Sequence, residues 1–219
     1  MFNLFTLLTA GGKISPEMVY LVLLLPVIAT AVAITRQVIG VKMLGAFAPI
    51  IATYAFLGTG LANGVLIACI IFLATMLLRY STKKLRIHYL PKVAILLTCV
   101  CIITLILMPL SIYIPIFSFT TVSSSAIILY ILLSDTYLSS EIQNGYKKAG
   151  KMYIETIIVA VVIYEIISIS GFKGFIETFP FIIFLFLIIN IIVGKWKGLR
   201  LVEIYRFRSV IKEKSKDYV

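Results

Sequence analysis

The residues of this chain that could carry chemistry are few, and they lie within or beside long apolar runs. Glu165 is the clearest, because it falls inside the apolar run 152–170, where an ionised carboxylate is costly unless it is paired, hydrated or protonated. A proton or cation site and a single interhelical hydrogen bond are equally good interpretations. Asp135 ends the run 116–137 and suits a structural ion pair with Arg36 or a nearby cation. Asn190 suits hydrogen bonding between packed helices.

A series of hydroxyl side chains marks the start of the run 116–137, including Ser123 and Ser124. They are too many for one helix face, so some must point into the bundle. They could line a polar cavity that opens outward. The favoured alternative is that they bond their own preceding carbonyls or let helices approach closely.

No catalytic or metal-binding set emerges from these residues. The chain has one histidine, His88, and no paired-histidine metal motif or nucleophile turn. An intramembrane enzyme would have to rely on Asp135 and Glu165, which we expect near opposite faces of the membrane, too far apart to act as a pair. Cys69, Cys99 and Cys101 lie in apolar runs without disulfide or zinc spacing and are expected in the core. We therefore expect a non-enzymatic protein without metal or cofactor.

The elements that position these residues are expected to be transmembrane helices. The chain of 219 residues is 61% hydrophobic and 13% charged, with a mean hydropathy of +1.10, which a soluble domain does not carry. Backbone in lipid must satisfy its own hydrogen bonds, so apolar runs predict helices. The sequence predicts an all-α integral membrane protein with a seven-helix bundle, its spans at about 18–35, 38–57, 61–78, 93–112, 116–137, 152–170 and 178–193.

The basic residues predict the orientation of these spans. Alternate connections and the tail carry two, five, three and eight of them, which is 18 of the 20 lysines and arginines. Because basic loops stay cytoplasmic, we expect the N-terminus outside and the C-terminus inside. The expected organisation is an external segment over 1–17, a membrane domain over 18–193 and a basic tail over 194–219. The positive charge then serves topology and anionic lipid, not nucleic acid.

The second span is the least regular of the seven. Lys42 lies near its start and would have to extend its ammonium toward the headgroups, so a short or partly re-entrant segment is the alternative. Its small residues recur at three- and four-residue steps and predict a face for close helix packing. They are Gly45, Ala48, Ala52 and Ala55.

Two cytoplasmic stretches carry a family resemblance. The first runs from Arg36 through Gly40 and Gly45 to Phe47 and Pro49, and the second, after the last span, contains Arg200, Glu203, Arg206 and Arg208. Together with the Leu78-Arg79-Tyr80 exit of the third span, they resemble a bacterial family of seven-transmembrane domains usually fused to an inactive transglutaminase domain. The resemblance covers most of the chain, although its apolar middle is not specific.

The resemblance implies a transglutaminase-like domain on the export side and an association with cytoplasmic ATP-grasp peptide ligases. No such domain precedes the first span in this sequence, so we expect it to be a separate protein or absent. The first hypothesis is a scaffold or sensor that couples an external partner to a cytoplasmic one. The alternative is a small transporter or exporter of a peptide-like or amino-acid-derived metabolite, using Glu165 and the hydroxyl-rich span. Self-association as a homo-oligomer is left open.

Overall fold

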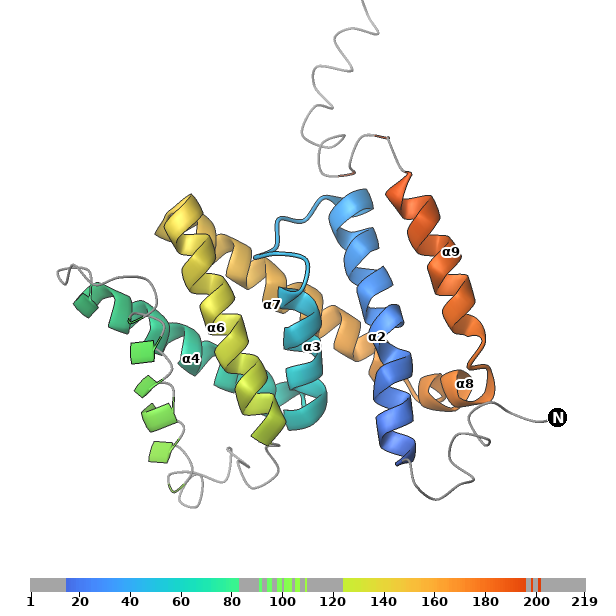
Figure 1. Ribbon diagram of the computed structural model, residues 1–219, viewed down its shortest axis with the longest axis horizontal. Coiled ribbons are helices and arrows are strands. Elements are labelled where there is room, and N and C mark those ends of the chain that lie inside the picture. Colours follow the sequence, from blue (N-terminus) through green and yellow to red (C-terminus); the bar gives the residue numbers. More distant parts are fainter. Residues whose placement is uncertain are drawn as a thin grey trace, which may run out of the picture. The chain divides into compact units, whose positions relative to one another are not determined.

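The computed structural model describes residues 15–82 and 124–195, together with isolated positions between 91 and 109 and residues 198 and 201 (Figure 1). Every regular element in this part of the chain is a helix, which confirms the predicted all-α class. The elements are α2 (Pro16–Ile34), the π-helical turn η1 (Thr35–Ile39), α3 (Ala48–Thr59), α4 (Leu61–Thr82), α6 (Ser124–Asn144), α7 (Tyr146–Ser168), α8 (Phe172–Thr178) and α9 (Ile182–Gly194).

The chain divides into two compact units. The first comprises Met1–Ala46 and Glu165–Val219 and contains α2, η1, α8 and α9. The second comprises Phe47–Tyr164 and contains α3, α4, α6 and most of α7. The contact of Asn190 with Thr30 lies within the first unit, and the contact of Tyr130 with Gly64 lies within the second.

In the first unit α2 and α9 lie side by side and run in the same direction (Figure 1). Pro26 and Ile183 line a common groove, and further along both helices Asn190 reaches Thr30. Pro16 starts α2 at the first helical position, where its missing N–H costs nothing. The short helix α8 contacts α2. The contact lies near the start of α2, where the Lys173 ammonium is 5.4 Å from the centre of the Tyr20 ring.

In the second unit α3 packs against both α4 and α6, and α4 packs against α6. Ala48, Ala52 and Ala55 of α3 are almost fully buried, because small side chains let neighbouring helices approach closely. This confirms the predicted packing face for the three alanines. Gly45, the fourth predicted member, precedes the helix.

Within the described residues, one helix is long and apolar enough to cross a membrane. It is α2 continued through η1, from Pro16 to Ile39. A second candidate arises if α7 and α8, which meet at a bend of 71°, count as a single span. Shorter apolar helices cover Ala48–Thr59, Leu61–Leu77 and Ile182–Gly194.

Several helix boundaries differ from those predicted. The second apolar run was expected to be helical from Val38, but α3 begins at Ala48, because Gly40 adopts the left-handed conformation with φ 92° and ends η1. Lys42 therefore lies between helices. In the fifth run the helix α6 continues to Asn144, past the predicted end at Tyr137, because a fall in hydropathy marks the edge of the apolar run and not the end of a helix. The fourth predicted span, 93–112, falls mostly outside the described residues.

The prediction for the cysteines was wrong. Cys69 and Cys101 are exposed and Cys99 is partly exposed, and all three are free thiols. Hydropathy does not separate buried from lipid-facing positions in a membrane helix, because lipid tails are as apolar as a protein core.

Candidate functional site

Asn190 and Thr30 join α9 to α2 through a short chain of hydrogen bonds. The Asn190 side-chain amide Nδ2 donates to the Thr30 hydroxyl at 2.9 Å, and that hydroxyl donates to the Pro26 carbonyl oxygen at 2.7 Å. Thr30 is buried, whereas Asn190 is partly exposed. The pair is a polar contact between two otherwise apolar helices, and such contacts in membranes hold helices in register.

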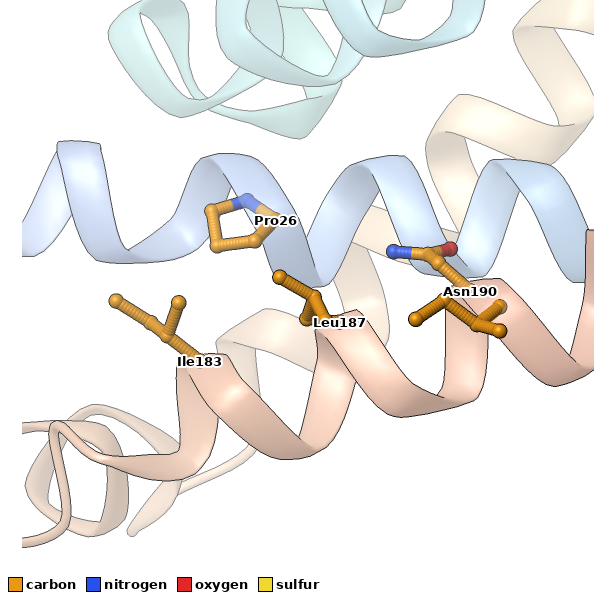
Figure 2. A pocket seen from close by; sticks show the side chains of 5 residues that line it. Pro26, Ile183, Leu187 and Asn190 are labelled. Carbon is orange, nitrogen blue, oxygen red and sulfur yellow. The ribbon is translucent and has the colours of Figure 1, made fainter.

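A groove of about 400 Å³ lies beside this contact. Figure 2 shows Pro26 on α2 facing the side chains of Ile183, Leu187 and Asn190, which follow one another along α9. Ile191 completes the lining. The lining is apolar except for Asn190, so this groove suits a hydrocarbon chain better than a polar metabolite.

The segment that leaves α2 carries the first sequence motif. Thr35–Ile39 forms a π-helical turn, in which the Gly40 N–H donates to the Thr35 carbonyl at 3.0 Å. Single π turns are frequent at functional sites. The turn presents the exposed side chain of Arg36, and the partly exposed Gly40 ends it.

The motif continues up to the start of α3. Met43 and Leu44 are buried, whereas Phe47 is 75% exposed. Gly45 is partly exposed, and the buried Pro49 lies in the first turn of α3. The motif therefore combines a buried apolar anchor with exposed basic and aromatic side chains, which is the composition of a docking segment.

The two intramembrane carboxylates predicted from the sequence have different surroundings. Glu165 is exposed on α7, and Asp135 is partly buried on α6. Arg36 and Asp135 belong to different units, so their predicted ion pair stays a prediction. The proton or cation site predicted at Glu165 also stays a prediction.

Several predicted site residues lie outside the described part of the chain. They are Ser123, Arg200, Glu203, Arg206 and Arg208. Ser124 is the first residue of α6, but its side chain is not described. In the part of the chain that the structure describes, no three His, Cys, Asp or Glu side chains come together as a metal site would require.

Sequence reasoning missed a buried polar contact in the second unit. The Tyr130 hydroxyl donates to the Gly64 carbonyl oxygen at 3.0 Å and lies 3.1 Å from the Thr59 hydroxyl. The Thr59 hydroxyl also donates to the Ala55 carbonyl at 2.8 Å. The only signal in the sequence is a tyrosine inside an apolar run, which does not reveal its partner.

An aromatic cluster that sequence reasoning also missed lies between α4, α6 and α7. Phe72 stacks on Tyr153 with ring centroids 4.3 Å apart, and Tyr137 meets Phe72 edge-on at 4.9 Å. The Tyr153 hydroxyl donates to the Ala68 carbonyl at 2.9 Å. Glu141, one turn after Tyr137, is 5% exposed. Sequence analysis did not select Glu141, because it lies after the predicted end of the fifth apolar run.

Comparison with known proteins identifies a matching family. A family described as seven transmembrane helices usually fused to an inactive transglutaminase matches residues 11–211. No curated protein and no solved structure matches the chain.

Proposed function

Because the chain belongs to the family of seven transmembrane helices usually fused to an inactive transglutaminase, it is a multi-pass membrane protein, and we propose that it is a membrane scaffold. In this proposal it couples a transglutaminase-like partner outside the membrane to a cytoplasmic partner, and it performs no catalysis of its own. The proposed organisation is an external segment 1–17, a seven-helix domain 18–193 and a basic tail 194–219.

The parallel course of α2 and α9 is the observation that carries the proposed topology. If both helices cross the membrane, parallel first and last spans require an odd number of crossings. The family's seven helices meet that requirement. The 18 basic residues on alternate connections then favour an external N-terminus and a cytoplasmic C-terminus in a bacterial cytoplasmic membrane.

The short helix α3 can be accommodated in this topology. Its 12 residues span about 18 Å, less than the ~30 Å hydrocarbon core. A span shorter than the hydrocarbon core is accommodated by local thinning of the bilayer, which would leave Phe47, directly before α3, at the inner interface.

The segment from Arg36 to Pro49 is the proposed docking site for the cytoplasmic partner. Arg36 is exposed in the first unit and Phe47 is exposed at the start of the second, and arginine and aromatic side chains are enriched at protein interfaces. The Arg36 guanidinium can pair with carboxylates of a partner. An ATP-grasp peptide ligase is the proposed partner, as the family resemblance implies.

Site-directed photo-crosslinking in cells tests this proposal. A photoreactive amino acid at Phe47 should give a covalent adduct with a cytoplasmic protein of the ATP-grasp class, identified by mass spectrometry. The same amino acid at Leu185, an exposed position on α9, should give only lipid adducts. Adducts from position 47 with lipid alone would exclude the docking site.

The transporter alternative receives less support from the described residues. Its proposed path uses Glu165, which is exposed, and a hydroxyl-rich stretch that lies mostly outside the described part. The groove beside α9 offers one polar side chain, Asn190, among apolar ones. A polar metabolite would lose its hydration there with little replacement.

A further inference from the structure

The groove between α2 and α9 changes in polarity along its length. Ile183 and Leu187 line one end (Figure 2), and Asn190, the one polar lining residue, lies beside Ile191 toward the other. The seven steps from Ile183 to Asn190 rise about 10 Å along the helix, which fits within one leaflet of a ~30 Å hydrocarbon core. The groove therefore has the length and polarity of a single leaflet, apolar at depth and polar toward the headgroups.

Two cations lie beyond the polar end of the groove. Lys195 follows the last residue of α9 and is exposed, about 7.5 Å past Asn190 along the helix axis. Arg36 is exposed on η1, and η1 contacts α9. Both side chains are long enough to reach a phosphate at headgroup level while their stems stay in apolar surroundings. The order along the groove is then hydrocarbon, amide and cation.

Asn190 has a hydrogen-bond donor available for a ligand. An asparagine amide carries two N–H groups, and one of them is used by the Thr30 hydroxyl. The second suits an acceptor such as an ester carbonyl. The groove is also open: Leu187 and Ile191 are about half exposed, at 55% and 51%, and no residue within α9 is buried.

We propose that this groove binds one phospholipid of the inner leaflet that carries an anionic headgroup. One acyl chain lies along Pro26, Ile183 and Leu187, the ester region meets Asn190, and Arg36 and Lys195 hold the phosphate. The assignment to the inner leaflet rests on the proposed topology, which puts Arg36 and Lys195 at the cytoplasmic face. The bound lipid would fix α9, which packs on α2, in its parallel register.

Lipid retention by the purified full-length protein tests the site. The probe is phosphatidylglycerol, added to the protein in detergent beside an equal amount of phosphatidylcholine, with bound lipid counted by native mass spectrometry. The wild type should retain phosphatidylglycerol preferentially. In the double variant Arg36→Gln/Lys195→Gln, retention of phosphatidylglycerol should fall by about fivefold or more, since each juxtamembrane cation adds to the attraction.

A matched control separates the site from general charge attraction. Lys147→Gln/Lys148→Gln removes the same charge from the exposed start of α7 in the other unit and should leave retention unchanged. Equal losses in the two double variants would overturn the proposal, because they would show that net charge alone attracts the lipid. Unchanged retention in Arg36→Gln/Lys195→Gln would overturn it as well.

A second variant tests the acyl-chain half of the groove. Leu187→Trp should fill the groove and reduce retention of both lipids, whereas Leu185→Trp changes an exposed α9 residue outside the lining and should not. Full retention by a folded Leu187→Trp protein would refute the acyl-chain site. If that variant does not fold, the retention of phosphatidylglycerol by the charge variants decides whether the groove binds the lipid. Retention in detergent does not depend on sidedness, so its failure is distinct from a failure of the proposed topology.

Discussion

The Tyr130 hydroxyl of α6 donates a hydrogen bond to the Gly64 main-chain carbonyl of α4 at 3.0 Å. Both residues are buried, and Phe56 of α3 lies against the same glycine. Three helices of the second unit therefore converge on one position that has no side chain. This close approach explains why glycine occurs inside an apolar helix, where it is otherwise unfavourable.

Gly64→Ala should destabilise the protein. The added Cβ would lie 2.6 Å from Phe56 Cδ1, 2.8 Å from Thr59 Oγ1 and 2.9 Å from the Tyr130 hydroxyl oxygen. All three distances are too short, so we expect a cost of about 1–3 kcal/mol, the usual range for overpacking. The midpoint of thermal unfolding in detergent measures it. Gly150→Ala is the matched control, since nothing lies within 4 Å of its added Cβ. An equal effect of the two substitutions would argue against the close approach.

Tyr130→Phe should cost less, about 1 kcal/mol, because it removes a hydrogen bond and leaves the ring in place. The same thermal measurement applies. Tyr146→Phe provides the control, since Tyr146 is 57% exposed. A loss for Tyr130→Phe no larger than that of its control would mean that the contact contributes nothing measurable.

The sequence predicted where this unit packs but not what holds it together. The alanine stripe of α3 was predictable because helical spacing puts Ala48, Ala52 and Ala55 on one face. The contact of Tyr130 with Gly64 was not, because the two lie 66 residues apart and periodicity carries no information on such pairs. The buried Glu141 was missed for a related reason: its burial follows from tertiary packing, whereas its residue type is usually found at the surface.

Helix ends were predictable where an apolar run begins or ends at the same residue as the helix, or close to it. The predicted start at Leu61 agrees with α4, and the predicted end of the last span at Val193 lies one residue before the end of α9. The start of the second helix was misplaced by ten residues. An apolar run shows which segment can lie in the hydrocarbon core of a membrane. The turn at Gly40 depends on a backbone conformation, which hydropathy does not measure.

Asn190 and Thr30 should be energetically coupled. In a double-mutant cycle with Asn190→Leu and Thr30→Val, we expect a coupling of about 0.6–1 kcal/mol, as for other hydrogen bonds between membrane helices. Thermal unfolding of the four proteins gives the value. Leu185→Ala serves as the unrelated partner for Thr30→Val, and that pair should be additive. Additivity of the Asn190 and Thr30 substitutions would show that the hydrogen bond does not stabilise the α2–α9 pair.

Gly40→Ala should destabilise the π-helical turn. Gly40 has φ 92°, and a residue with a Cβ pays about 1–2 kcal/mol in the left-handed region. Because this turn forms the first part of the proposed docking segment, the adduct yield from a photoreactive residue at position 47 should fall together with the unfolding midpoint. Gly174→Ala, at a position without positive φ and with nothing within 4 Å of the new Cβ, should change neither. An unchanged adduct yield in Gly40→Ala would show that docking of the cytoplasmic partner does not require the π-helical turn.

The sidedness of the two chain ends tests the central proposal most directly. With Cys69, Cys99 and Cys101 replaced by serine, a single cysteine is placed at Lys13 in one variant and at Ser215 in another. We predict that a membrane-impermeant maleimide labels position 13 in intact cells and position 215 only after the membrane is permeabilised. Labelling of both positions from the same side would require an even number of crossings and would contradict the seven-span, N-outside account.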